Sequence, residues 1–116
     1  MSSSSGNALG FSAFPTWDDL TNLSVTITTT GRPVLLIIQG DGSDTTNEGY
    51  IANGRFRFLR DSTLVGRVYA GADINCAGIT CIDTPGAGTY TYKFQSQNSA
   101  SGTPVAFYCK LVAFEL

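Results

Sequence analysis

Hydrophobic and polar residues alternate with a period of two over much of the chain, which is the pattern of β-strands with one buried face. Between residues 23 and 28, Leu, Val and Ile alternate with Ser and Thr, and at residues 90–95 Tyr and Phe alternate with Thr, Lys and Gln. Phe56 and Phe58 alternate with two arginines, and residues 64–70 follow as the expected partner strand. No stretch shows the 3.6-residue period of an amphipathic helix.

Two other segments are apolar on both faces. Val34–Ile38 has five consecutive apolar residues, which is typical of a strand covered on both sides. In the last strand, residues 105–116, the expected core face holds Phe107, Cys109, Leu111 and Ala113. The other face holds Tyr108, Val112, Phe114 and Leu116. These four need cover from another subunit, or else from the second sheet or an N-terminal segment, because an apolar strand is a poor free edge.

Short strands separated by Gly, Asp, Ser and Pro predict an all-β domain over residues 22–116, a jelly-roll β-sandwich of about eight antiparallel strands. Asp61-Ser62-Thr63 is expected to form a tight turn. Residues 71–88 are expected to be mostly loop, with a short strand near Ile79. Residues 1–21 are expected to form a flexible arm.

The expected arm carries three aromatic residues, Phe11, Phe14 and Trp17, among small and polar ones. Large apolar side chains are costly to leave in water. They therefore either fold back on their own domain or become ordered on a partner.

Composition and charge narrow the classes of partner. The chain has 116 residues, of which 14% are charged. Soluble domains average about a quarter. Its surface is therefore either rich in Ser, Thr, Asn and Gly or hidden in an assembly. The net charge of −2 predicts neither a nucleic-acid partner nor a membrane partner. The N-terminus lacks the features of a secretory signal, so we expect synthesis in a cytoplasm.

The reactive residues do not form an enzyme motif. The chain has no histidine, and we expect neither catalysis nor a cofactor or metal requirement. Asp41, Asp44 and Glu48 could together bind calcium weakly, although their spacing does not fit an EF-hand. Cys76 and Cys81 either form a disulfide across their loop or stay reduced.

Arg55 and Arg57 lie on one face of the strand that contains Phe56 and Phe58. This pair of arginines could bind acidic groups. The alternative is a solvated or interface face.

Four segments, taken in order, resemble small jelly-roll domains of tailed bacteriophages. They are residues 31–35 (GRPVL), 58–63 (FLRDST), 83–92 (DTPGAGTYTY) and 110–116 (KLVAFEL). The resemblance covers residues 22–116. Domains of this family lie at the C-termini of tail fibres or form stand-alone virion proteins. The resemblance implies a TNF-like jelly roll that assembles as a homotrimer.

This chain differs from the common family pattern because only a short arm, with no fibre shaft, precedes the jelly roll. We therefore expect a homotrimeric capsid decoration (cement) protein of the virion. Its arm would bind the major capsid protein or other virion proteins through Phe11, Phe14 and Trp17. The alternative is the trimeric receptor-binding tip of a tail fibre, which recognises a host surface glycan or protein.

Overall fold

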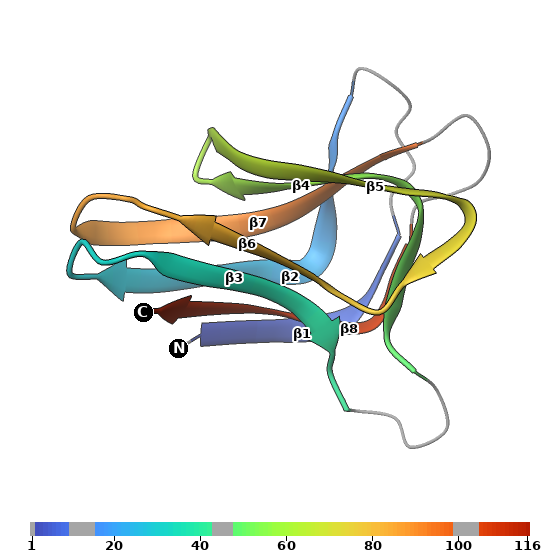
Figure 1. Cartoon of the computed structure of the whole chain (residues 1–116), viewed down its shortest axis with the longest axis horizontal. Helices are drawn as coiled ribbons and strands as arrows, with labels where there is room; N and C mark the ends of the chain where they lie inside the picture. Colours follow the sequence, from blue (N-terminus) through green and yellow to red (C-terminus); the bar gives the residue numbers. More distant parts are fainter. Residues whose placement is uncertain (1, 10–15, 43–47, 99–104) are drawn as a thin grey trace.

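The computed structural model describes residues 2–9, 16–42, 48–98 and 105–116 (Figure 1). In these residues the regular structure consists of eight strands and no helix. The strands are β1 (Ser2–Leu9), β2 (Asp18–Thr29), β3 (Val34–Gly40), β4 (Tyr50–Arg60), β5 (Thr63–Cys76), β6 (Ile79–Asp83), β7 (Gly88–Asn98) and β8 (Val105–Glu115). The predicted all-β fold is confirmed.

The strands pair in the nested order of a jelly roll. β1 pairs with β8, β2 with β7, β3 with β6 and β4 with β5, all antiparallel, as in one long hairpin rolled onto itself. Ladders between β3 and β8 and between β4 and β7 complete two layers, β1-β8-β3-β6 and β2-β7-β4-β5. In Figure 1 the layers overlap, with β3 across β2 and β6 across β7. The fold is therefore a β-sandwich.

Two strands change partner at a residue with left-handed backbone. β4 pairs with β8 up to Ala52 and with β7 from Gly54, and Asn53 between them has a φ of 68°. β8 pairs with β4 up to Phe107 and with β3 from Cys109. Tyr108 lies at that change, with a φ of 50° that is uncommon for a bulky residue. Such bulges bend strands, and here they join the two layers.

The core lies between the layers. Buried side chains from both layers meet there, among them Val25, Ile27, Val34, Leu36, Ile38, Phe56, Phe58, Tyr92, Phe94 and Leu111. The Phe94 ring stacks on Phe56, with 5.3 Å between ring centroids, and is tilted against Phe58 at 5.0 Å. The alternating apolar residues of the sequence are therefore the inward face of each strand.

The N-terminal segment differs from the expected flexible arm. Ser2–Leu9 is strand β1, which pairs with β8 from Ser2 opposite Ala113 to Leu9 opposite Val105. The predicted boundary at residue 21 falls inside β2, which begins at Asp18. The physical reason is the edge of β8, whose backbone N–H and C=O groups gain partners from β1.

Residues 71–76 also differ from the prediction, since they continue β5 instead of forming a loop. Asn75 pairs with Ala52 and Cys76 with Ile51. The expected turn after β4 is confirmed, because Arg60 pairs with Thr63 across a two-residue connection. The short strand near Ile79 is present as β6.

Candidate functional site

The outer face of the β8-β3-β6 layer carries adjoining apolar side chains. Leu35 of β3 lies directly opposite both Ile82 of β6 and Phe114 of β8, so the three form one row across the layer. Ile82 is 58% exposed and Phe114 44% exposed, while Leu35 is half-buried. The row is therefore open to solvent in the single chain.

A second row lies beside the first. Ile37 is opposite Val112 on one side and Thr80 on the other. Ile37 is half-buried, and Val112 is only 6% exposed. We name the set formed by Leu35, Ile37, Ile82, Val112 and Phe114 the apolar face.

The predicted subunit-interface residues do not all lie in this set. Phe114 belongs to it and is exposed, and Leu116, just after β8, is 43% exposed. Val112 is already buried within the chain, between β3 and β1 in the sheet, so it has the cover from its own chain that was the alternative to a second subunit. Tyr108 lies instead at the bulge where β8 changes partner.

The prediction for the last strand missed Leu35, Ile37 and Ile82. The signal for the first two was present in Val34–Ile38, where every residue is apolar. Only the inward face of that strand is buried in the structure. The sequence predicted cover on both faces of this strand, but the outward side chains Leu35 and Ile37 are only half-buried in the single chain.

The outer face of β2 and β7 has the opposite chemistry. Thr26 faces Thr91 and Thr28 faces Thr89, with Oγ1 atoms 2.9 and 2.8 Å apart in the two pairs. We name these four threonines the polar face. Their hydroxyls bond to one another within each pair, so this face is stable without a protein partner.

Beyond the polar face, the outer surface of β7, β4 and β5 is rich in arginine. The register places Gln97, Arg55 and Tyr69 in one cross-strand row and Gln95, Arg57 and Arg67 in the next. Trp17 lies over the second row, with its ring centre 4.3 Å from Cζ of Arg57 and 5.6 Å from Cζ of Arg67.

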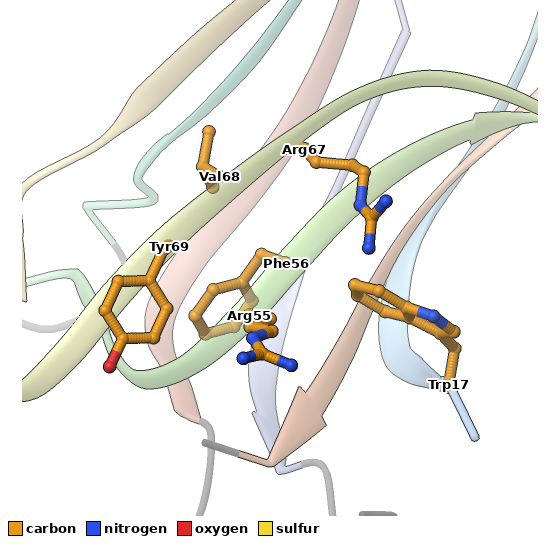
Figure 2. A pocket seen from close by; sticks show the side chains of 6 residues that line it. All are labelled: Trp17, Arg55, Phe56, Arg67, Val68 and Tyr69. Atoms are coloured by element: carbon orange, nitrogen blue, oxygen red, sulfur yellow. The ribbon is translucent and has the colours of Figure 1, made fainter. Parts of the chain in front are cut away.

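These rows form an open pocket of about 350 Å³ (Figure 2). Its lining residues are Trp17, Arg55, Phe56, Arg67, Val68 and Tyr69. We name this pocket the arginine groove.

The arginine groove has an excess of positive charge. Arg57 and Arg67 lie directly opposite each other, which is unfavourable for like charges. Burial and then the charge of Arg67 lower the pKa of Arg57, while Asp19 opposes the shift. Arg57 Nε donates to Gln95 Oε1 at 2.7 Å, and Gln95 Nε2 donates to Asp19 Oδ1 at 2.6 Å.

Arg55 and Arg67 are the two arginines that line the groove, and Arg57 lies next to it against the Trp17 ring. Among the residues that the structure describes, the ion pairs join Arg60 to Asp83 and Lys93 to Asp19, and none involves Arg55 or Arg67. The positive charge of these two side chains is therefore available to an external anion.

Trp17 folds onto its own domain, which was one of the two alternatives for the aromatic residues of the arm. Its ring contacts two arginines, and Gln97 Nε2 donates to the carbonyl of Thr16 at 3.5 Å. The segment before β2 thus lies across the outer face of β7. Phe11 and Phe14 lie outside the described residues, so their proposed role in attachment stays a prediction.

Comparison with family models, with curated proteins and with solved structures found no match. The resemblance to bacteriophage jelly rolls therefore rests on the residues quoted above and stays a prediction.

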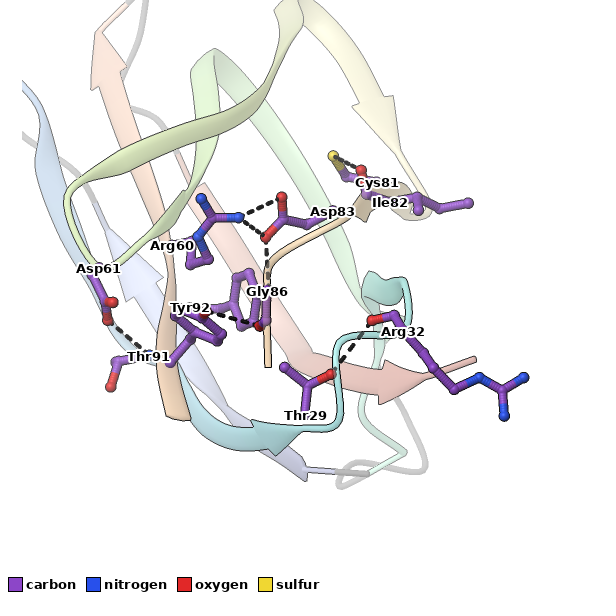
Figure 3. A network of polar contacts seen from close by, with 11 residues as sticks. Thr29, Arg32, Arg60, Asp61, Cys81, Ile82, Asp83, Gly86, Thr91 and Tyr92 are labelled. Carbon is purple, nitrogen blue, oxygen red and sulfur yellow. Dashed lines mark hydrogen bonds and ion pairs between the residues drawn. The ribbon is translucent and has the colours of Figure 1, made fainter. Parts of the chain in front are cut away.

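The two layers are also tied by a polar network at one end of the sandwich (Figure 3). Arg60 Nη1 of β4 donates to both carboxylate oxygens of Asp83 of β6, at 2.9 and 2.7 Å. Tyr92 Oη of β7 donates to the same carboxylate at 2.8 Å. Hydrogen bonding to Asp83 raises the pKa of Arg60, and burial, then Asp83, raise the pKa of Tyr92. Both groups keep their protons, so the network is structural.

Glu115 at the end of β8 holds the turn between β2 and β3. Its Oε1 accepts hydrogen bonds from Thr29 Oγ1 (2.7 Å), from Thr30 N and Oγ1 (2.8 and 2.6 Å) and from Arg32 N (3.4 Å). These donors lower the pKa of Glu115 to about 2. The carboxylate therefore connects the end of one layer to the start of the other.

The cysteines differ in their environments. The Cys109 thiol is buried and donates to the Tyr50 carbonyl at 3.4 Å, and burial raises its pKa to about 11. A thiol with so high a pKa is a poor nucleophile at neutral pH. Cys81 is a free thiol whose pKa is raised by burial. A free Cys81 agrees with the alternative of reduced thiols, and the side chain of Cys76 lies outside what the structure describes.

The three carboxylates that could together bind calcium weakly are not all among the described residues. Asp44 lies outside them, while Asp41 and Glu48 lie inside. Within the described ranges, no three His, Cys, Asp or Glu side chains converge to hold a metal ion. The same ranges hold no helix long and apolar enough to cross a membrane.

Proposed function

We propose that this chain is a structural protein of a bacteriophage virion, a capsid decoration protein that assembles as a homotrimer through its apolar face. The observation that carries the assembly is the row of Ile82, Leu35 and Phe114, which is apolar across three strands and open to solvent. The trimer and the virion role are further supported by the resemblance of residues 22–116 to phage jelly rolls.

The energetics favour a second copy of the chain as the cover of this face. Fully burying one large apolar side chain is worth about 1.5–3 kcal/mol. Contiguous exposed apolar side chains therefore indicate an interaction surface. A subunit interface would also explain the low content of charged residues, 14%, because charges are depleted at the centres of interfaces. Three copies arranged around one axis would each contribute the same face.

Attachment to the virion is assigned to Phe11 and Phe14. Trp17 already contacts Arg57 and Arg67 of its own domain, so it contributes less apolar surface to a partner than the other two aromatics. The proposed partners are the major capsid protein or other virion proteins. The proposed role is one of assembly and binding, not of catalysis.

A second candidate function is favoured by the arginine groove. An open pocket that combines Trp17 and Tyr69 with arginines suits the recognition of a ligand. The receptor-binding tip of a tail fibre, which recognises a host surface glycan, would use such a pocket.

Light scattering at several protein concentrations tests the assembly. The wild-type chain should have three times the 12.3 kDa mass of one chain. Ile82→Asp and Phe114→Asp should each give a folded monomer, because a carboxylate would have to be buried in the interface. The matched control is Thr26→Asp on the polar face, which should remain trimeric. A monomeric wild-type protein, or trimers in both apolar-face variants, contradicts the proposal.

Co-sedimentation with phage heads that lack the protein tests the virion role. Point variants are preferable to deletion of the N-terminus, because residues 2–9 form strand β1. Wild-type protein should sediment with the heads, and a Phe11→Ser, Phe14→Ser variant should not. Binding of the variant as strong as that of the wild type places the attachment elsewhere. Binding to host cells but not to heads supports the tail-tip alternative.

A further inference from the structure

The arginine groove has a chemistry that self-assembly does not use. We propose that it binds an acidic saccharide, that is, a sugar ring that carries a carboxylate. This inference does not depend on the assembly proposed above, since the groove lies on the layer opposite the apolar face, and it names the ligand class of the second candidate function.

The groove places aromatic and cationic groups around one space. Figure 2 shows Tyr69 and Trp17 on opposite sides of the pocket, with Arg55 between them and Arg67 above the indole. Arg55 and Tyr69 are neighbours on adjacent strands, as are Arg57 and Arg67. The rigid β4–β5 ladder fixes these positions, so the groove exists before a ligand arrives.

The charge of the groove is suited to a carboxylate. Arg55 and Arg67 are exposed and have no ion pair with any of the carboxylates that the structure describes. A guanidinium group binds a carboxylate through two parallel N–H···O bonds. An anion placed here would also relieve the repulsion between Arg57 and Arg67, which lie opposite each other.

The aromatic residues are suited to the sugar ring. Tyr69 is 63% exposed, and it offers both a flat apolar ring and a hydroxyl group. Trp17 lines the same pocket, and the part of its indole that Arg57 and Arg67 leave free adds apolar surface against which the C–H face of a pyranose can pack. An inorganic anion would gain nothing from the two apolar rings.

Two other ligand classes fit less well. Nucleic acid binding requires a wide basic surface, whereas this chain has a net charge of −2 and, of its arginines, only Arg55 and Arg67 line the groove. A large ligand does not fit either, because a volume of about 350 Å³ is near the lower end of the range for ligand pockets. The groove therefore suits a short saccharide or the end of a longer one.

Tryptophan fluorescence, excited at a wavelength where the five tyrosines do not absorb, reports on this groove, because Trp17 is the only tryptophan of the chain. The full-length protein is titrated with two matched pairs of probes: trigalacturonic acid and its methyl ester, and 3′-sialyllactose and lactose. Inorganic phosphate at equal ionic strength is a fifth probe. Uronate and sialate are two sources of the same carboxylate chemistry, and the two pairs distinguish them.

The expected result is a saturable change with at least one acidic saccharide, binding at least about tenfold weaker for its neutral counterpart, and no change with phosphate. The tenfold difference corresponds to the loss of one charge-assisted contact. Equal binding of the acidic and neutral members, the same response to phosphate, or no response to either acid up to tens of millimolar would overturn the proposal.

Variants assign the binding to the named residues. Arg55→Gln and Arg67→Gln should each weaken binding about tenfold, since each removes a charged donor from the groove. Arg32→Gln is the matched control, because Arg32 lies at the opposite end of β2 and its side chain points away from the domain (Figure 3). Circular dichroism checks that all variants are folded. Wild-type affinity in both groove variants would overturn the proposal.

The proposals for the arginine groove and for the trimer can be contradicted independently of each other. Phe114→Asp should lose the trimer and keep the acidic saccharide, whereas Arg67→Gln should do the reverse. Loss of saccharide binding in the folded Phe114→Asp monomer would contradict the placement of the ligand within one chain.

Discussion

The two layers of the sandwich contribute to one core, yet their outer faces have opposite chemistry. On β3 every residue from Val34 to Ile38 is apolar, whereas in residues 23–28 of β2 the buried apolar residues alternate with Ser or Thr. The outward side chains of β3 join Ile82 and Phe114 in the apolar face. Those of β2 form the polar face with the threonines of β7. An inward apolar face is needed to fold, whereas an outward one is not.

The difference separates folding from assembly. Burial of the inward face stabilises the single chain in both layers. On the outward face, further burial of Ile82 and Phe114 can stabilise only a complex, because the single chain leaves both side chains largely exposed. The polar face of the second layer shows that this fold does not require apolar side chains on its outer surface. We attribute the apolar face of the other layer to the proposed assembly.

The largest effect is expected from two phenylalanines in the two environments. Phe94→Ala should lower the free energy of unfolding by about 3–5 kcal/mol, because Phe94 is fully buried between Phe56 and Phe58. Phe114→Ala should change it by less than about 0.5 kcal/mol in the monomer and weaken the assembly instead. Urea unfolding at a protein concentration below that of trimer formation measures the free energy of unfolding of both variants, and light scattering at higher concentration measures the assembly. Equal losses of unfolding free energy in the two variants would mean that Phe114 stabilises the single chain as much as Phe94 does.

A smaller effect is expected at the network that ties the layers together. Asp83→Asn should cost about 1–3 kcal/mol, because it weakens the hydrogen bonds that Arg60 and Tyr92 donate to the carboxylate. Tyr92→Phe, which removes one of these bonds, should cost less. The free energy of unfolding of both variants is again measured with urea. A Tyr92→Phe variant less stable than Asp83→Asn would show that the carboxylate is not the centre of the network.

A third expected effect concerns the polar face alone. Thr28→Ala should cost about 0.2–1 kcal/mol, because it removes an exposed cross-strand hydrogen bond to Thr89. It should leave the mass of the assembly unchanged. Thermal unfolding and light scattering of the same sample give both results. If the Thr28→Ala variant dissociates, the subunit contact lies on the polar face and not on the apolar face.

The last expected effect depends on pH. The folded pKa of Glu115 is about 2 against an ordinary value of 4.5, so its contribution to stability is complete above pH 4.5 and is lost as the pH falls towards 2. The melting temperature of Glu115→Gln should therefore lie below that of the wild type at pH 6. The difference should shrink between pH 4.5 and 2. A difference that is constant over this range would mean that the charge of Glu115 does not hold the turn.

Local patterns in the sequence predict the strands and their inward faces. The alternation at residues 23–28 and 90–95 and the turn at Asp61 depend only on neighbouring residues, so they can be recognised without the fold. Ser2–Leu9 could not be recognised as a strand, because its small polar residues form a strand through backbone bonds to β8. Residues 71–76 were missed for the same reason, since their pairing with β4 is a long-range contact.

The candidate sites likewise divide into residues that local patterns predict and residues that only strand pairing brings together. Phe114 was predicted because its own strand is apolar on both faces, but Ile82 lies in a short strand whose partner is not apparent from the sequence. Arg55 and Arg57 were recognised as a pair on one face. Trp17 and Arg67 join them only through strand register, so the arginine groove could not be predicted from local patterns.

The most direct test of the apolar face is an isotope-filtered NOE experiment on assemblies mixed from ¹³C-labelled and unlabelled chains. Only contacts between different chains give a signal. The account predicts intermolecular NOEs that involve the Phe114 ring and the methyl groups of Leu35 and Ile82, and none from the threonine methyls of the polar face. Intermolecular NOEs confined to Thr26 and Thr28, or an assembly without any NOE to Phe114 and Ile82, would contradict it.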